Sequence, residues 1–306
     1  MQGVNLIRTV LTGGKGYTGL HVLRALLDAR HHVTAVLRSP EKLGPIARHP
    51  QLTVVEMDLE DDARIAAVLP GHDVCVHTAI IWGDPGDEFE MRDTAVAAKL
   101  FEAAGNAGLT RCLYLSSVAV HRPFAGEMSE DNGFSATDLY GATKAAGELV
   151  LRAACAKHKM TGVVVRPGPV VGLPAFAGGS FRSDNRVAAM VAAAAEGRAI
   201  EVVRDDGRQF SDVSTVTKAV RLLTTAADPH PAYICVDRNI ITWERIARLV
   251  LECLNSRSEV RVLPRNTPEP TPRFRTERIE RLIGGPLDAT EALLAHIRYL
   301  ARISGT

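Results

Sequence analysis

The chain has 306 residues, of which 46% are hydrophobic and 23% charged, a balance typical of a folded globular protein rather than a disordered or fibrous one. Lysine and arginine exceed aspartate and glutamate by one charge, so no overall field attracts nucleic acid or an anionic membrane. We therefore expect neither as a partner. At about 100 to 200 residues per domain, the length predicts one large domain or two closely joined ones.

Apolar runs and cysteines predict a cytoplasmic protein. The richest apolar run, residues 187–195, is much shorter than the ~18 residues of a membrane span, and the first residues do not resemble a secretory signal. No CxxC pair is present, so we expect buried thiols in a reducing compartment and no metal site. The five cysteines are Cys75, Cys112, Cys155, Cys235 and Cys253.

Short β-branched runs alternate with helix-period segments through the first half of the chain. The segments between the runs predict helices, the longest at residues 89–107 and 137–158. Repeated βα units of this kind predict an α/β fold with a doubly wound parallel sheet of the Rossmann type. The predicted strands lie at residues 9–12, 33–37, 53–56, 74–78, 112–116 and 162–166.

The alternation ends after Arg166, where prolines and glycines predict a long irregular connection. Further helices are predicted at residues 187–196, 242–254 and 291–302. We expect a dinucleotide-binding domain made of residues 1–172 and 205–241. A smaller, mixed α/β substrate lobe is expected from residues 173–204 and 242–306.

A glycine-rich turn, TGGKGYTG at residues 12–19, follows the first predicted strand and leads into a helix expected at residues 20–30. The glycines permit a tight turn, leave room for a pyrophosphate and let the helix pack on the strand, with the helix N-terminus facing the anion. A glycine-rich turn without a ligand is the alternative. The cofactor-binding residues predicted here are Thr12, Gly13, Lys15, Gly16, Tyr17, Thr18 and Gly19.

The end of the second strand favours NADP over NAD. An NAD site usually places an acidic residue there to hold the ribose 2′-hydroxyl, whereas this chain has Arg38 and Ser39, which can bind a 2′-phosphate. A solvated strand-end charge is the competing interpretation of Arg38. Asp58, after the third strand, is placed to reach the adenine edge or to cap the helix that follows.

Tyr140 and Lys144 lie four residues apart at the start of an alanine-rich helix, so they share one helix face. A tyrosine has a pKa of about 10, and a neighbouring ammonium favours the phenolate and brings proton transfer closer to neutral pH. We therefore expect Tyr140 to act as acid and base, with Lys144 beneath it. An ordinary pair of helix residues is the alternative.

Paired serines follow the apolar part of the fifth strand. A hydroxyl there can polarise a carbonyl oxygen or hold an alcohol beside Tyr140. Ser117 is the predicted catalytic residue, and Ser116 is the second choice and a candidate for substrate contact. Serines also end many strands for structural reasons alone. The glycine turn, the serine pair and the Tyr–Lys pair occurring in this order favour catalysis.

In these motifs the sequence resembles the extended short-chain dehydrogenases/reductases of the NAD-dependent epimerase/dehydratase type. The resemblance also rests on the pair Asp58-Leu59, on VHTA at residues 76–79 and on RPGPVVG at residues 166–172. It implies a triad of Ser117, Tyr140 and Lys144, in which Lys144 also holds the nicotinamide ribose. Through these segments it further implies cofactor contacts from Leu59, Thr78, Ala79 and Pro167.

The resemblance also implies a homodimer built through the helices at residues 89–107 and 137–158. It implies a C-terminal substrate lobe in which the predicted strand at residues 208–213 resembles the segment where an arginine meets a nucleotide diphosphate. Arg208 is the candidate for that role, because a guanidinium pairs well with phosphate oxygens. A basic surface strand is the alternative.

The implied chemistry is hydride transfer at a carbinol or carbonyl carbon of a nucleotide sugar. The family's dehydratases carry an acidic pair after the catalytic serine or threonine, where this chain has Val118 and Ala119, so we expect no dehydration. A 4-epimerase and a 4-ketoreductase remain. Outside this class, the alternatives are an NADPH-dependent reductase of a non-sugar ketone or aldehyde, and an NADP-sensing regulatory protein.

Two further residues are candidates for substrate contact. Trp82 follows the fourth strand and could line the site, with core or rim packing as the alternative. His121 follows the serine pair, where the family usually has a tyrosine. It could touch the substrate, although a histidine after an apolar strand more often packs or caps.

Overall fold

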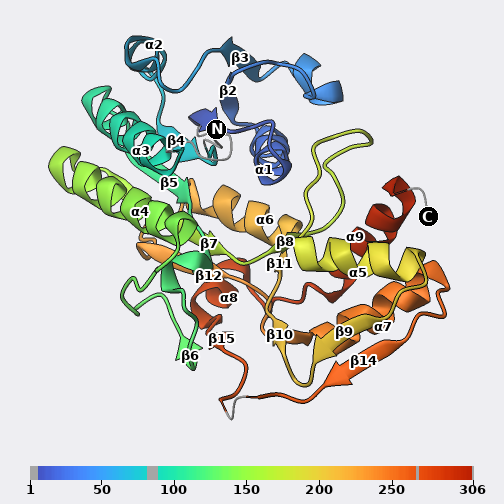
Figure 1. The fold of residues 1–306 in the computed structure, drawn as a ribbon. Coiled ribbons are helices and arrows are strands. Elements are labelled where there is room, and N and C mark those ends of the chain that lie inside the picture. Colours follow the sequence, from blue (N-terminus) through green and yellow to red (C-terminus); the bar gives the residue numbers. More distant parts are fainter. Residues whose placement is uncertain (1–5, 81–88, 267–268, 305–306) are drawn as a thin grey trace.

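The structure is a computed structural model that describes residues 6–80, 89–266 and 269–304. Its centre is a sheet of seven parallel strands in the order β12-β7-β5-β4-β1-β2-β3 (Figure 1). The doubly wound fold is therefore confirmed. All six predicted strands are present to within one residue at each end, and β12 was not predicted. The strands are β1 (Arg8–Thr12), β2 (His32–Leu37), β3 (Leu52–Glu56), β4 (Val74–His77), β5 (Arg111–Leu115), β7 (Thr161–Pro167) and β12 (Ala232–Cys235).

The strand order reverses between β1 and β4. From β1 the chain adds β2 and β3 on one side, and then crosses back to place β4 on the other side. In a doubly wound sheet, ligands bind in the crevice at the carboxyl edge of the strands at such a point. The carboxyl ends of β1, β4, β5 and β7 lie along this edge, so the residues that follow them meet there.

Helices cover both faces of the sheet, which explains why all four residues of the central strand β4 are buried. One face packs against α1 (Tyr17–Asp28), α6 (Val213–Leu223) and α8 (Glu277–Ile283). The other packs against α2 (Asp62–Val68), α3 (Phe89–Asn106) and α4 (Leu139–His158). Figure 1 shows α3 and α4 lying side by side on this second face.

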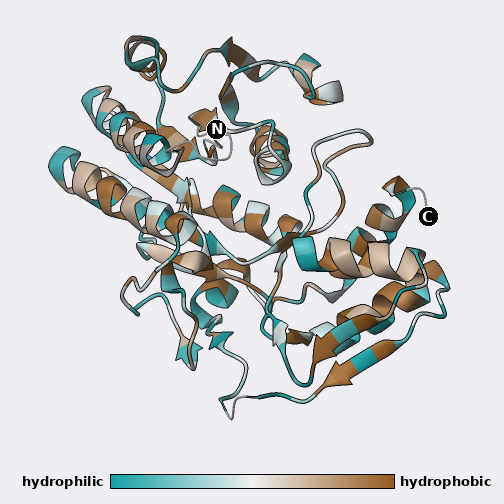
Figure 2. Ribbon diagram, in the orientation of Figure 1, coloured by the Kyte–Doolittle hydropathy of each residue, from teal (hydrophilic) through white to brown (hydrophobic). Residues whose placement is uncertain are grey.

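A second group of elements packs around its own core, which includes Trp243, Val187 and Leu293. Its helices are α5 (Asn185–Ala195), α7 (Trp243–Leu254) and α9 (Thr290–Ile303), and its paired strands are β9 (Ile200–Val203) and β14 (Val260–Leu263). Figure 2 shows hydrophobic residues concentrated along β9, β14 and the strands of the main sheet. The described part of the chain has no helix of the length and apolarity that crossing a membrane requires.

The predicted strand at residues 208–213 is wrong. The segment contains two short strands, β10 (Gly207–Arg208) and β11 (Ser211–Asp212), and α6 begins at Val213. The reason is a helix cap, since the Asp212 carboxylate accepts a hydrogen bond of 2.9 Å from the Ser214 amide. The other short elements are η1 (Gly44–Arg48), η2 (Val118–His121), β6 (Glu127–Met128), β8 (Val170–Val171), β13 (Ile241–Thr242) and β15 (Arg273–Phe274).

Candidate functional site

The glycine turn connects β1 to α1 at the crevice. Gly13 has a φ of +75°, and a Cβ at this position would lie 2.4 Å from the backbone nitrogen of Ala79. A Cβ at Gly19 would lie 2.0 Å from the carbonyl oxygen of Gly13. Side chains are thus excluded at both positions, which allows the turn to pack against the end of β4 and against the first turn of α1.

The outer side of the turn suits a dinucleotide pyrophosphate. A Cβ at Gly16 would meet only the Gly13 carbonyl oxygen, at 3.4 Å, so the backbone is accessible there. Because α1 begins at Tyr17, unpaired amides and the positive end of the helix dipole lie next to this space. The Thr78 hydroxyl donates a hydrogen bond of 2.7 Å to the Thr12 carbonyl and fixes the end of β4 beside the turn.

The residues predicted to bind the adenosine half lie after β2 and β3. Arg38 is exposed, and the Ser39 hydroxyl accepts a hydrogen bond of 3.3 Å from the Glu41 amide. No acidic residue ends β2. Asp58 is exposed and accepts from the Glu60 amide at 3.0 Å, which orders its own loop.

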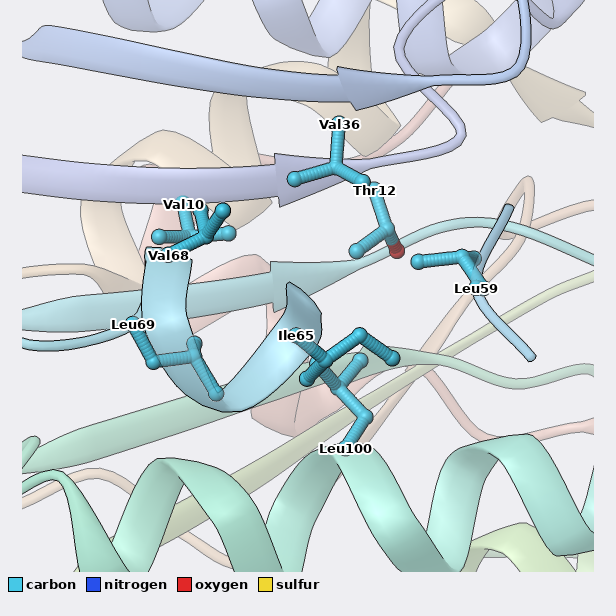
Figure 3. A pocket seen from close by; sticks show the side chains of 8 residues that line it. All are labelled: Val10, Thr12, Val36, Leu59, Ile65, Val68, Leu69 and Leu100. Atoms are coloured by element: carbon cyan, nitrogen blue, oxygen red, sulfur yellow. The ribbon is translucent and has the colours of Figure 1, made fainter. Parts of the chain in front are cut away.

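Leu59 packs behind the turn. Figure 3 shows its side chain pointing toward Thr12 across a small apolar cavity between the sheet, α2 and α3. Asp61, rather than Asp58, caps α2 by accepting from the Arg64 amide at 3.1 Å. Asp58 therefore does not cap α2, whose cap is Asp61.

Tyr140 and Ser117 meet at the carboxyl end of β5. Asp138 caps α4 by accepting from the Gly141 amide at 3.0 Å, which places Tyr140 in the first helical turn. Ser117 caps η2 by accepting from the Ala119 amide at 3.1 Å. The Ser117 hydroxyl lies near enough to the Tyr140 phenol to lower its pKa. Two helix caps thus bring the two hydroxyl groups together.

Opposing effects act on the ionisation of Tyr140. Burial raises the pKa of the phenol above its ordinary value, and this is the largest effect. The Ser117 hydroxyl and the positive charges of Arg182 and Arg122 lower this pKa, while the charge of Asp93 raises it. Arg182 lies in the loop between β8 and α5, and Arg122 follows η2. Sequence analysis missed both arginines because neither belongs to a motif next to Tyr140.

Lys144 lies one helical turn beyond Tyr140 and is buried. Its ammonium donates a hydrogen bond of 3.2 Å to the Tyr114 hydroxyl and lies 3.9 Å from the Asp93 carboxylate. The structure therefore surrounds Lys144 with residues of β5 and α3 that the sequence did not single out. A single acidic residue in a predicted helix carries no signal of its own.

Ser116 and His121 lie behind the site in a buried, charged network. Ser116 donates to Glu148 at 2.6 Å, and Arg166 binds the same carboxylate through hydrogen bonds of 2.9 and 2.7 Å. The His121 ring contacts Arg166 at 3.1 Å and the Gly133 carbonyl at 3.3 Å. The structure thus places both predicted substrate contacts in the protein interior, bonded to protein groups.

The remaining predicted residues lie in different surroundings. The Arg208 side chain is 44% exposed, pairs with Asp184 at 3.3 Å and stacks on Trp243 with 5.4 Å to the ring centroid. Pro167 is buried at the end of β7. Trp82 lies outside the described residues. Among the residues that the structure describes, no cluster of three or more His, Cys, Asp or Glu side chains is arranged to hold a metal ion.

The loop between β8 and α5 is fixed against the glycine turn. The Ser180 hydroxyl donates a hydrogen bond of 2.6 Å to the Lys15 carbonyl. The Phe181 ring packs edge-on against Tyr17, with 5.8 Å between the ring centroids. Arg182 follows directly, so the charge that acts on Tyr140 comes from a segment anchored at the turn.

Comparison with known proteins shows the family of this chain. The family model for the NAD-dependent epimerase/dehydratase family matches residues 9–235. The chain belongs to this family. The match covers the glycine turn, the serine pair and the Tyr–Lys pair of this epimerase/dehydratase family member.

Curated relatives of this family member differ in their named activities. It is 32% identical over 178 residues to a 3 beta-hydroxysteroid dehydrogenase/Delta 5-->4-isomerase of Mycobacterium tuberculosis, a match that covers 54% of this chain and 47% of the relative. It is 30% identical over 174 residues to a UDP-glucose 4-epimerase of Azospirillum brasilense, covering 54% of this chain and 49% of the relative. These matches span about half the length of the relatives.

A solved structure matches over nearly the whole chain. UDP-glucuronic acid 4-epimerase from Bacillus cereus in complex with NAD superimposes with a TM-score of 0.82 at 16% identity, covering 97% of this chain and 99% of that one. At this identity the likeness establishes the shared fold.

We expect His77 to make the stability of this family member depend on pH. It ends β4, and its Nδ1 lies 2.6 Å from the Thr12 hydroxyl. Burial, assisted by the charge of Lys144, lowers the pKa of His77 from 6.5 to about 3. The unfolded chain therefore takes up a proton below pH 6.5 that the folded chain excludes, so the free energy of unfolding falls as the pH drops toward 3.

We predict that His77→Gln removes up to about 5 kcal/mol of this pH dependence between pH 6.5 and 3. Urea unfolding at a series of pH values measures it, and the exposed His32→Gln variant is the control. An identical slope of unfolding free energy against pH in wild type and His77→Gln would show that His77 is not the group responsible.

Proposed function

We propose that the chain is an NAD(P)-dependent oxidoreductase of the epimerase/dehydratase type that transfers hydride at a carbinol or carbonyl carbon of its substrate. The observation that carries this proposal is the nearness of the Ser117 hydroxyl to the Tyr140 phenol at the carboxyl edge of the sheet, beside a turn that fits a dinucleotide. A nicotinamide cofactor bound there supplies the acceptor and donor of the hydride.

Each residue of the triad has its own part in this reaction. The Tyr140 phenolate takes the proton of the substrate hydroxyl during oxidation, and the resulting phenol returns a proton during reduction. The Ser117 hydroxyl holds the same substrate oxygen. The Lys144 ammonium favours the phenolate of Tyr140, and the resemblance assigns it the ribose of the cofactor as well. Burial opposes the phenolate, so the nearby cations are needed.

Loss of water is not part of the proposed reaction, because elimination needs an acid and a base beside the substrate. Val118 and Ala119, which follow Ser117, are buried and carry no carboxyl group. Glu148, the carboxylate bonded to Ser116, is occupied by two hydrogen bonds from Arg166. We therefore propose a 4-epimerase or a 4-ketoreductase.

The proposed substrate is a nucleotide sugar. Arg122 and Arg182 place guanidinium groups near the phenol of Tyr140, and these two cations favour an anionic substrate. Arg208 is the proposed contact of the diphosphate. The named activity of the Azospirillum brasilense relative supports this substrate class.

A second candidate is an NADPH-dependent reductase of a non-sugar ketone or aldehyde. Two observations favour it. Arg208 already pairs with Asp184, which competes with a diphosphate for the guanidinium. In addition, the Mycobacterium tuberculosis relative is named as a hydroxysteroid dehydrogenase, and a steroid is not a sugar.

We also propose how the chain is organised around this reaction. Residues 1–172 and 205–241 form the dinucleotide-binding domain, and residues 173–204 and 242–306 form the substrate lobe, although α8 packs against the main sheet. A homodimer through α3 and α4 is proposed as well, supported by Leu149 on α4, which is 49% exposed.

A substitution at Arg38 tests the proposed preference for NADP. We predict that Arg38→Ala weakens NADPH binding about tenfold or more and leaves NADH binding nearly unchanged, because only NADPH carries the 2′-phosphate. Fluorescence titration measures both dissociation constants, with exposed Arg48→Ala as the control. Equal NADPH affinity in the wild type and the Arg38→Ala variant would contradict this assignment.

A substitution at Tyr140 tests the proposed acid/base chemistry. We predict that Tyr140→Phe lowers turnover by about 10²- to 10⁴-fold, the usual contribution of a positioned acid/base, while cofactor affinity is retained. Tyr233→Phe, which removes a phenol remote from the crevice, should keep full activity. Unchanged turnover in Tyr140→Phe would rule out the assigned acid/base.

A substrate screen separates the two candidate classes. UDP-, GDP- and dTDP-linked sugars are compared with simple ketones and aldehydes, with formation of epimer and consumption of NADPH as readouts. We predict turnover of a nucleotide sugar, and a KM raised about tenfold or more by Arg208→Ala but not by Arg248→Ala on the exposed side of α7. Turnover of simple ketones alone, with equal KM in both variants, would favour the second candidate.

A further inference from the structure

A cluster of three ionisable side chains lies beneath the candidate site. Lys144 of α4, Asp93 of α3 and Tyr114 of β5 are all buried. The Lys144 ammonium lies 3.2 Å from the Tyr114 hydroxyl and 3.9 Å from the nearer carboxylate oxygen of Asp93. Three separate elements therefore converge on one cation in the interior.

Packing fixes the position of Tyr114 in this cluster. Its ring stacks on His77, with 5.5 Å between the centroids and 14° between the planes. A Cβ at Gly147, on the buried face of α4, would lie 2.5 Å from the Tyr114 hydroxyl oxygen. The absence of a side chain at Gly147 is thus what allows this hydroxyl to reach Lys144.

A buried ammonium is unstable unless an opposite charge compensates for its lost hydration. Two carboxylates act on Lys144, those of Asp93 and Glu148. Glu148 already receives two hydrogen bonds from Arg166, whereas Asp93 forms an ion pair with Lys144 itself. Asp93 is therefore the carboxylate that compensates the charge of Lys144 most directly.

The other groups that face Lys144 are neutral. Burial keeps His77 uncharged above a pKa of about 3. Burial also raises the pKa of Tyr114 well above its ordinary value, and Asp93 is the largest charged contributor to that rise. Burial raises the pKa of Tyr140, on the same helix, as well.

We propose that Asp93 is a positioning residue for the reaction, whose buried carboxylate keeps the Lys144 ammonium charged and aimed at the candidate site. This inference rests on the proposed function for its catalytic consequence, but the ion pair itself can be tested without a substrate. Lys144 lies one helical turn beyond Tyr140, where its charge favours the phenolate. The charge of Asp93 itself opposes the phenolate, so in this proposal Asp93 assists the reaction only through Lys144.

The test measures the titration of Lys144 directly. The chain has only seven lysines, so ¹³Cε-lysine labelling gives few NMR signals, and loss of one signal in Lys144→Arg assigns it. Burial lowers the pKa of Lys144 and the charge of Asp93 opposes that effect. We predict that Asp93→Asn, which keeps the shape of the side chain, lowers the pKa of Lys144 by about one pH unit or more.

A matched control uses an exposed pair of the same type. Asp62 lies 2.8 Å from Lys99 on the surface, and Asp62→Asn should leave the Lys144 signal unchanged. A second measurement uses the wild-type protein alone, in which the Lys144 signal should also move at the acidic pH where Asp93 takes up a proton. This keeps the proposal testable if Asp93→Asn does not fold.

Cofactor binding supplies the functional readout. As the pH is raised, NADPH affinity and turnover should decline at a lower pH in Asp93→Asn than in the wild type, because Lys144 loses its proton at a lower pH in the variant. An unchanged Lys144 titration in Asp93→Asn, or a wild-type signal that does not respond to Asp93, would overturn the inference. Neither result would contradict the assignment of Tyr140 as the acid and base. That assignment fails only if Tyr140→Phe turns over substrate at the wild-type rate.

Discussion

The close approach of the glycine turn to the end of β4 is the constraint on which the rest of the site depends. Because Gly13 has no side chain, the turn after β1 packs directly against Ala79 after β4, at the point where the strand order reverses. The helix N-terminus of α1 and the hydroxyl groups after β5 then face the same crevice. Because parallel strands end on one edge, residues that are more than a hundred positions apart in the sequence become neighbours there.

Electrostatics within this crevice depend on both parts of the molecule. Burial alone would keep Tyr140 protonated, and the cations that oppose burial are Arg122, directly after η2, and Arg182 in the loop before α5. His296 of α9 holds this loop, since its ring nitrogens lie 2.9 Å from the Gly172 carbonyl and from the Ser183 hydroxyl. The second core therefore helps to set the chemistry at the first, because it anchors the segment that carries Arg182.

The sequence was sufficient to predict the fold but only part of the site. Alternating apolar runs located six of the seven sheet strands, and the glycine turn and the Tyr–Lys spacing are local patterns that depend on few distant contacts. The segment at residues 208–213 was misassigned because the Asp212 cap, rather than strand propensity, decides where α6 begins. Asp93, Tyr114 and Arg182 escaped prediction since their role arises from packing between elements distant in the chain, for which a single sequence carries no periodic signal.

Isotope transfer tests the central claim, that the crevice transfers hydride at a substrate carbon, most directly. A substrate labelled with deuterium on the reacting carbinol carbon is incubated with the protein and cofactor in ordinary water, and the products are analysed by mass spectrometry. The account predicts that the deuterium stays on that carbon in the epimer or passes to the nicotinamide ring, without exchange with water. Loss of the label to solvent during turnover would contradict it, because the bond would then have been broken by proton abstraction.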